Sequence, residues 1–232
     1  MKEKLKQYAK ELKISDTGVC EARVYPELCD ILSSYDTPFT APPEQRVSPF
    51  TFVPGAKSII MCAFNYFSGR APGNVSKYAR GMDYHTVVRD KLAALCTRLE
   101  ADIGAFAHYI FCDTSPLCDK YLAYQAGLGI FGRNHLLIHP VYGSYIFLGG
   151  IVTDLPLAAD VPLKGGCAGC GRCAAACPGQ AFAYGFDAAR CASYLLQKKG
   201  ALSEEEQAVV KRAGMAWGCD ICSDVCPHNV SV

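Results

Sequence analysis

Cysteine spacing constrains this chain more than any other feature of its sequence. Eight of its 14 cysteines lie between residues 167 and 226, and the first four form the run Cys-x2-Cys-x2-Cys-x3-Cys-Pro at Cys167, Cys170, Cys173 and Cys177. In ferredoxins that hold two 4Fe-4S clusters, the first three thiolates of such a run bind one cluster and the fourth ligates the other. The segment is therefore predicted to fold around two clusters.

Cys219, Cys222 and Cys226 form a second run that repeats this pattern without its first cysteine. Cys191 is the remaining cysteine of the segment. Two 4Fe-4S clusters need four thiolates each. We therefore predict one cluster on Cys167, Cys170, Cys173 and Cys226, and the other on Cys177, Cys191, Cys219 and Cys222. Zinc is the alternative for paired cysteines, but structural zinc sites close at four ligands and rarely end in Cys-Pro, which favours clusters. Between the two runs, Ser203 and Glu206 form a capping box and predict a helix that ends near Gly214.

The rest of the sequence indicates the cellular compartment and the classes of partner to expect. The other six cysteines are scattered through the first 118 residues without ligand spacing, and the basic N-terminus has no apolar segment behind it. No apolar run is long enough to span a bilayer, so we expect a cytoplasmic protein with no membrane partner and with reduced thiols. The net charge of +1 indicates no global attraction to nucleic acid.

The N-terminal part alternates helical and strand patterns. We predict helices over 3–12, 83–99 and 115–126, the last opened by Ser115-Pro116, and strands over 58–67, 105–112, 136–138 and 144–152, with a surface loop over 36–55. This alternation predicts an α/β (α+β) domain over residues 1–160, followed by a ferredoxin-like domain over 161–232.

One nucleotide-binding pattern lies in the wrong context. Residues 127–132 match Gly-x-Gly-x-x-Gly, but they follow a predicted helix and lead into a strand. A dinucleotide fingerprint follows a strand and opens a helix, so the pattern argues against nicotinamide or flavin binding here. The alternative that this segment is a loop whose backbone approaches another cofactor remains open.

Several segments occur in the order found in one known family. They are Tyr78 to His85, Asp113-Thr-Ser-Pro116, Ala126 to Asn134, Gly143-Ser144, Thr153 to Leu157 and the eight-cysteine segment. Together they resemble the epoxyqueuosine reductase family, cobalamin-dependent iron–sulfur enzymes of queuosine biosynthesis in tRNA that are related to reductive dehalogenases. The resemblance covers roughly residues 55–230.

The resemblance implies a nitroreductase-like cobalamin domain packed against the two-cluster domain. Electrons from a donor of flavodoxin or ferredoxin type would pass through the clusters to base-off cobalamin, and Asp113 would give a proton to the oxygen that leaves as water. The resemblance also implies contacts to cofactor or substrate from Arg80, Tyr84, His85, Gly129, Gly132, Asn134 and Ser144.

Two of these residues carry a competing interpretation. A proton donor needs burial to hold its proton near neutral pH, whereas Asp113, two residues before the predicted helix start, could instead cap that turn as a charged group. His85 follows Asp83 as in the start of the histidine-on cobalamin motif, but Val88 stands where that motif has glycine. Base-off binding is therefore expected, and a solvated or helix-capping His85 is the alternative.

The chain departs from the family in three places. It ends at Val232, where the family continues with helical repeats that help grip tRNA; Gly129-Ile-Phe-Gly132-Arg133-Asn134 lacks the usual tryptophan and lysine; and His228 precedes Asn229, where tryptophan is usual. We therefore expect a short form that reduces either epoxyqueuosine in tRNA or a small substrate. The alternative is a non-enzymatic double-cluster electron-transfer protein or a cobalamin-reducing partner.

Overall fold

A four-stranded antiparallel sheet forms the centre of the N-terminal domain. The computed structural model describes residues 1–33, 41–183 and 185–229. The strand order is β1-β2-β6-β3, made of β1 (Asp16–Glu21), β2 (Ser58–Asn65), β6 (Ile146–Thr153) and β3 (His108–Phe111). Because every pairing is antiparallel, the predicted mixed helix and sheet class is confirmed in its α+β form.

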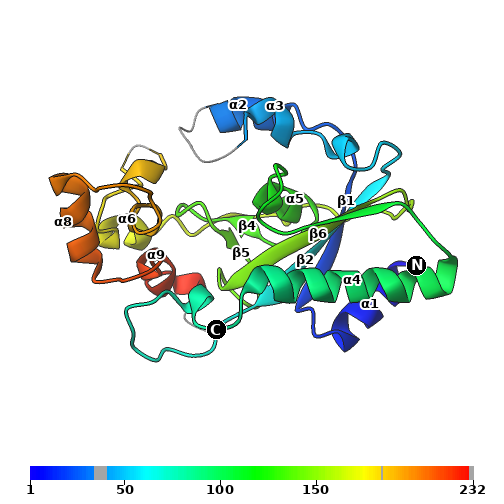
Figure 1. Cartoon of the computed structure of the whole chain (residues 1–232), viewed down its shortest axis with the longest axis horizontal. Helices are drawn as coiled ribbons and strands as arrows, with labels where there is room; N and C mark the ends of the chain where they lie inside the picture. Colours follow the sequence, from blue (N-terminus) through cyan, green and yellow to red (C-terminus); the bar gives the residue numbers. More distant parts are fainter. Residues whose placement is uncertain (34–40, 184, 230–232) are drawn as a thin grey trace.

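Strand β2 is buried on both faces and divides the core into two layers. Its residues from Ser58 to Phe64 are all buried, which suits a near-continuous apolar run. Ile60, Cys62 and Phe64 pack towards helices α1 (Lys2–Glu11) and α4 (Tyr84–Ile103). Ile59, Met61 and Ala63 pack on the opposite side with α2 (Glu27–Ser33) and α5 (Asp119–Gln125). Figure 1 shows the helices on both sides of the sheet.

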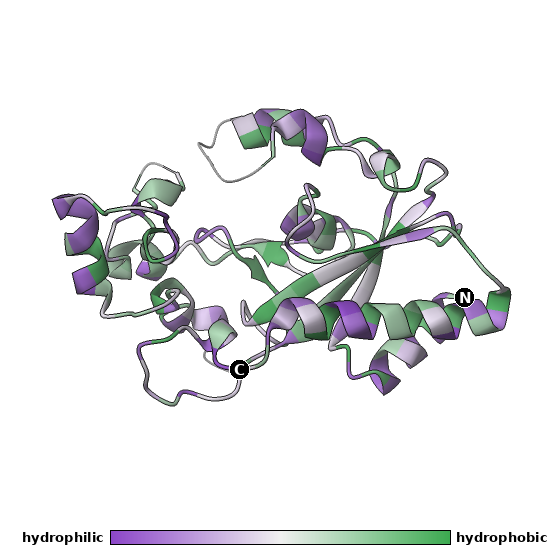
Figure 2. Ribbon diagram, in the orientation of Figure 1, coloured by the Kyte–Doolittle hydropathy of each residue, from purple (hydrophilic) through white to green (hydrophobic). Residues whose placement is uncertain are grey.

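Helix α4 confirms the predicted periodicity. Val88, Leu92, Leu95 and Leu99 are buried on one side, and the Asp83 carboxylate caps the first turn by accepting from the His85 amide. Figure 2 shows alternating hydrophilic and hydrophobic bands along α4 and along α8, the pattern of amphipathic helices. Gly104 ends α4 with φ at 82°.

The predicted helix start at Ser115-Pro116 is wrong. Helix α5 begins at Asp119, four residues later than predicted. The Ser115 hydroxyl accepts a hydrogen bond from the Leu117 amide at 3.2 Å, so it closes a local turn instead of capping a helix. The loop that carries Asp113 nevertheless folds back onto the first residue of α5, because the Asp113 amide donates to Asp119 Oδ2.

Two other predictions need correction. Strand β1 was not predicted, because Asp16–Glu21 shows neither strict alternation nor a long apolar run. The segment 36–55 is not loop throughout: it contains α3 (Pro43–Arg46) and a 3-10 turn at Pro49–Thr51, while residues 36–40 lie outside the described residues. The 127–132 segment leads into a small hairpin of β4 (Ile130–Phe131) and β5 (Leu137–Ile138).

The cysteine module contains short helices and little sheet. It holds α6 (Arg172–Ala176), α7 (Ala192–Leu195), α8 (Glu204–Ala213) and α9 (Ile221–Asp224), with 3-10 turns at Ala188–Arg190 and Pro227–Asn229. The capping box of Ser203 and Glu206 is confirmed, and Gly214 ends α8 in the left-handed region. The domain boundary predicted at residue 160 falls in the extended segment between β6 and α6. No described helix is long and apolar enough to cross a membrane.

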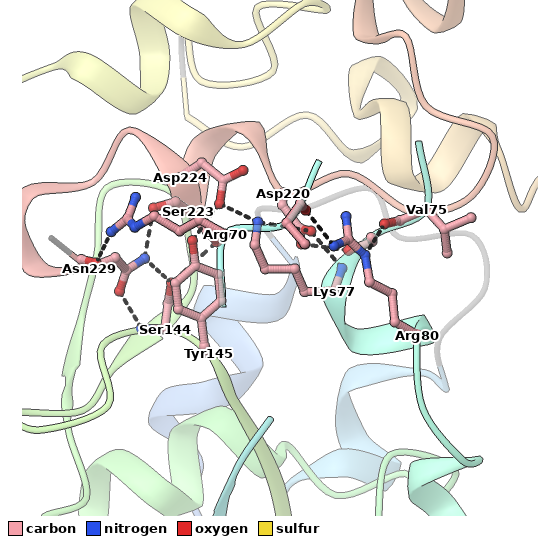
Figure 3. Close-up of polar contacts among 12 residues, drawn as sticks. Arg70, Val75, Lys77, Arg80, Ser144, Tyr145, Asp220, Ser223, Asp224 and Asn229 are labelled. Carbon is pink, nitrogen blue, oxygen red and sulfur yellow. Dashed lines mark hydrogen bonds and ion pairs between the residues drawn. The ribbon is translucent and has the colours of Figure 1, made fainter. Parts of the chain in front are cut away.

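A buried polar seam joins the two domains, and Figure 3 shows its contacts. The Asp220 carboxylate accepts from the Ser76 hydroxyl at 2.5 Å and from the Lys77 amide at 2.7 Å. The Lys77 ammonium lies 3.7 Å from Asp220 and 2.7 Å from Asp224, which also accepts from the Tyr145 hydroxyl. Asp220 and Lys77 are both buried, so each charge depends on the other.

Removing the Asp220 carboxylate should therefore loosen the seam. Asp220→Ala leaves the Ser76 hydroxyl and the Lys77 amide without their acceptor, and the Lys77 ammonium keeps only its ion pair with Asp224. We expect the substitution to cost about 3–5 kcal/mol. That loss corresponds to a fall of roughly 6–20 °C in the midpoint of thermal unfolding of the cluster-loaded protein. Glu11→Ala, which breaks an exposed ion pair with Arg98, is the control and should change the midpoint little. Equal midpoints for the two variants would contradict the role of Asp220.

Candidate redox and proton-transfer site

The cysteines of the C-terminal module form two neighbouring groups. Burial raises the pKa of the Cys226 thiol, and the nearby sulfurs of Cys167 and Cys170 raise it further. Burial also raises the pKa of Cys173, which lies within electrostatic reach of Cys167 and Cys226. Cys167, Cys170, Cys173 and Cys226 thus form one spatial group.

The second group lies beside the first. Burial raises the pKa of Cys219 to about 11 and that of Cys222 to about 12, and Cys177 and Cys191 add to both. Cys222 is also influenced by Cys173, so the groups are adjacent. Raised thiol pKa values mean that these sulfurs need a positive partner to ionise, as a metal cluster provides. Among the described residues, no three His, Cys, Asp or Glu side chains converge on a single-ion position.

A hollow at the domain boundary is lined by the first cysteine group. Arg133, Asn134 and Ile138 of the N-terminal domain line one side, and the four sulfur-bearing residues line the other. A Cβ on Gly132 would come within 2.4 Å of Asn134 Oδ1, and one on Gly129 within 2.6 Å of the Ile138 carbonyl. These two predicted cofactor contacts therefore have a packing role of their own in the hairpin.

Asp113 lies on a loop with a strained backbone. Its φ is 58°, which is uncommon for a residue with a side chain, and its amide donates to Asp119 Oδ2 at 2.9 Å. The Asp113 carboxylate accepts from the Tyr84 hydroxyl at 3.0 Å and lies 3.3 Å from His85 Nε2. Asp119 thus holds the loop in position, while Tyr84 and His85 orient the side chain.

Tyr84 and His85 are themselves held in place. Tyr84 stacks on Phe147 with ring centroids 4.2 Å apart, and His85 stacks on Tyr84 at 4.0 Å. His85 Nδ1 lies 2.7 Å from the Asp83 carboxylate, so both ring nitrogens face carboxylates. Burial raises the pKa of Tyr84 well above its usual range, and the neighbouring Asp113 adds to the shift, so this hydroxyl remains a hydrogen-bond donor.

Asp119 is a carboxyl whose pKa lies far above its ordinary value. Burial raises its pKa to about 7, although the Asp113 amide opposes the shift. Its Oδ1 is buried and has no hydrogen-bond partner among the described residues. Sequence reasoning missed this residue because its role depends on the Asp113 loop folding back onto the start of α5.

The space between the Asp113 loop and the second cysteine group, which we term the crevice, is bordered by Lys120, a residue within electrostatic reach of both. Burial lowers the pKa of Lys120, whereas Cys118, Asp113 and Cys222 oppose that shift. Burial raises the pKa of Tyr66, with contributions from Asp220 and Cys222. Lys120 and Tyr66 were not predicted, because no spacing pattern marks them and only the tertiary fold brings them together.

Two further predicted residues lie at the seam rather than beside Asp113. The Arg80 guanidinium donates to the carbonyls of Val75 and Ala71, both at 2.8 Å, and so stabilises the loop that leads to Ser76 (Figure 3). The Ser144 amide donates to Asn229 Oδ1 at 2.8 Å, and its hydroxyl accepts from Asn229 Nδ2. Their predicted contacts to cofactor or substrate stay predictions.

Comparisons with known proteins agree with this architecture. Residues 46–114 match the family model "Epoxyqueuosine reductase QueG, DUF1730", and residues 166–229 match the "4Fe-4S double cluster binding domain". The cysteine module is therefore a 4Fe-4S double-cluster domain.

Curated relatives and solved structures extend the match across the chain. Epoxyqueuosine reductase from Leadbetterella byssophila is 40% identical to this chain, and the match covers 80% of this chain and 63% of the relative. Epoxyqueuosine reductase from Lactococcus garvieae is 33% identical, and the match covers 100% of this chain and 70% of the relative. The Streptococcus thermophilus enzyme superposes with a TM-score of 0.92 at 32% identity, over 100% of this chain and 67% of that one.

A structure of epoxyqueuosine reductase with an epoxyqueuosine-modified tRNA-Tyr stem loop has a TM-score of 0.90 at 34% identity, over 98% and 65% of the two chains. A reductive dehalogenase at 16% identity and a TM-score of 0.66, over 98% of this chain and 31% of that one, shares the fold. The chain thus spans 63% of the length of the Leadbetterella relative. With a 33% identical relative covered over 70% of its length, the chain belongs to the epoxyqueuosine reductase family.

Proposed function

We propose that the chain is an iron–sulfur and cobalamin-dependent reductase of epoxyqueuosine in tRNA. The observation that carries this proposal is that Lys120 lies within electrostatic reach of both Asp113 and Cys222 of the second cysteine group. Relatives named epoxyqueuosine reductase, and the solved complex of one with a modified tRNA stem loop, support the choice of substrate. The reaction would remove the epoxide oxygen as water, using two electrons and two protons.

The two cysteine groups would hold the two clusters. Cys167, Cys170, Cys173 and Cys226 would bind one, and Cys177, Cys191, Cys219 and Cys222 the other. The mutual influence of the sulfurs within each group supports this assignment. Because Cys222 lies within electrostatic reach of Lys120 and Tyr66, the second cluster would be the one nearer the crevice.

Cobalamin would occupy the crevice without a histidine ligand. Both nitrogens of His85 already face carboxylates, which supports base-off binding. When bound, cobalamin would supply a cobalt centre able to reduce the epoxide. Lys120, positioned by a 3.1 Å hydrogen bond to the His135 carbonyl, would add positive charge to the crevice.

Asp113 would hold and deliver a proton. Its side chain is 64% exposed in the chain alone, so the shielding that a proton donor needs would come from the cofactor and substrate in the crevice. Tyr84 and His85 would keep the carboxyl aimed at the substrate.

The chemistry of the clusters also indicates the type of electron donor and the cellular compartment of the protein. Low-potential clusters near the surface accept electrons from small carriers, and we infer a flavodoxin or ferredoxin type of donor. Eight thiolates that must remain available to iron suit a reducing compartment, so a cytoplasmic location is proposed.

Substitution of single ligands tests the cluster assignment. Cys173→Ser and Cys226→Ser should each lower iron from about eight to about four atoms per chain and leave the same residual cluster signal. Cys191→Ser should also halve the iron but leave the other cluster's signal, as electron paramagnetic resonance of the reduced protein would measure. Cys118→Ser, outside both groups, is the control and should retain about eight irons. Full iron content in Cys191→Ser would remove Cys191 from the ligand set.

Anaerobic cobalamin binding followed by a reductase assay tests the activity. Wild-type protein should bind one equivalent with a base-off spectrum and convert epoxyqueuosine in a tRNA stem loop. Asp113→Asn should bind cobalamin and both clusters normally but turn over about 10²- to 10⁴-fold more slowly, because it cannot donate the proton. Asp90→Asn, on the exposed side of α4, is the control.

The outcomes of this assay separate the alternatives. Cobalamin binding without turnover of the stem loop would favour a small substrate. Failure to bind cobalamin at all would leave the double-cluster electron carrier. Normal turnover by Asp113→Asn would reduce Asp113 to a structural residue.

The pKa of Asp119 predicts a pH dependence of stability. The unfolded chain releases this proton near pH 4 and the folded protein near pH 7, so the folded state holds more protons between these values. The contribution of Asp119 to stability should therefore fall as pH rises from 4 to 7 and level off above 7. The unfolding midpoint of cluster-loaded wild type should drop more between pH 5 and pH 8 than that of Asp119→Asn. Parallel pH profiles would contradict the raised pKa.

A further inference from the structure

Asn134 carries a buried donor that the protein does not satisfy. The residue is 5% exposed, and its Oδ1 accepts a long hydrogen bond from the Leu136 amide at 3.4 Å. Its Nδ2 is buried and has no hydrogen-bond partner among the described residues. An unmet buried donor lowers the stability of the fold, so a ligand that accepts from Nδ2 would offset that cost.

The position of Asn134 indicates what that acceptor is. Asn134 lines the hollow at the domain boundary, together with Cys167, Cys170, Cys173 and Cys226. The other lining side chains are mostly apolar or small, apart from Arg133 and His228. Cysteine sulfur is therefore the most abundant potential hydrogen-bond acceptor among the side chains that line this hollow.

The hairpin holds Asn134 rigidly. Gly132 donates to the Leu136 carbonyl at 2.9 Å and accepts from the His135 amide at 3.0 Å, which closes the turn around Asn134. The absence of a side chain at Gly132 makes room for Asn134 Oδ1, which a Cβ would approach to 2.4 Å. The turn thus restricts the orientation of Asn134 at the hollow that it lines.

We propose that Asn134 Nδ2 donates a hydrogen bond to a sulfur of the cluster on Cys167, Cys170, Cys173 and Cys226 and thereby raises its reduction potential. A donor to a cluster sulfur stabilises the more negative, reduced state, and such hydrogen bonds are among the factors that set cluster potentials. The inference rests on the proposed ligand set. Asn134 is a tuning residue contributed by the N-terminal domain to a cluster held by the other domain.

A redox titration of single variants tests the hydrogen bond. Asn134→Leu is similar in volume and neutral, and it removes the donor; one cluster should shift to a more negative potential while the other stays unchanged. Asn134→Asp keeps an acceptor for the Leu136 amide but replaces the donor with a negative charge, so its shift should be larger and in the same direction. Asn65→Leu, outside the hollow, is the control and should leave both potentials unchanged.

A measurement on the unsubstituted protein tests the same hydrogen bond and remains informative even if the variants lose the cluster. With side-chain amides of asparagine labelled with ¹⁵N, pulsed electron paramagnetic resonance of the reduced protein should detect one amide nitrogen coupled to one cluster. Asn229 also lies near Cys226, but its Nδ2 already donates to Ser144 Oγ and to the Ser223 carbonyl. No coupled amide nitrogen in wild type would overturn the inference.

The outcomes also distinguish this inference from the ligand assignment on which it rests. Two intact clusters with unchanged potentials in Asn134→Leu would remove the tuning role and leave the ligand set standing. Fewer than about eight irons in wild type would instead overturn the ligand set itself.

Discussion

The buried carboxylate of Asp220 is the interaction on which the arrangement of the two domains depends. The cysteine module is built from short helices and has few large buried apolar residues, chiefly Phe182 and Leu195. Such a module cannot hold its position by hydrophobic packing alone. The pairing of Asp220 with Ser76 and Lys77 therefore fixes where the cysteine groups lie relative to the Asp113 loop.

Among the described residues, each of the two buried side-chain atoms that lack a hydrogen-bond partner lies beside one part of the candidate site. Asp119 Oδ1 is next to the loop that carries Asp113, and Asn134 Nδ2 is next to the first cysteine group. Proteins rarely leave such atoms unpaired, and where they do the cause is commonly a functional site or a missing ligand. No other buried side-chain nitrogen or oxygen of the described residues lacks a partner, which is consistent with cofactor contacts at these two places.

The sequence predicted those features that depend on local spacing. The interval between cysteines anticipated the two spatial groups, the apolar period anticipated α4, and Ser203 with Glu206 anticipated α8. Features that depend on tertiary contacts escaped it. The Ser115 hydroxyl closes a local turn instead of capping a helix, and β1 is a strand because it pairs with β2. Lys120 comes near the second cysteine group only when the two domains are docked.

The shared lining of the hollow has a consequence for chemistry in air. Arg133 and Asn134 line the hollow together with the first cysteine group, in which Cys173 and Cys226 are buried while Cys170 is exposed. A transient separation of the seam would expose the sulfurs of Cys173 and Cys226 before either domain unfolds. We therefore expect the polar contact between Ser76, Lys77 and Asp220 to influence how quickly dioxygen reaches these two sulfurs, although it lies in another part of the chain.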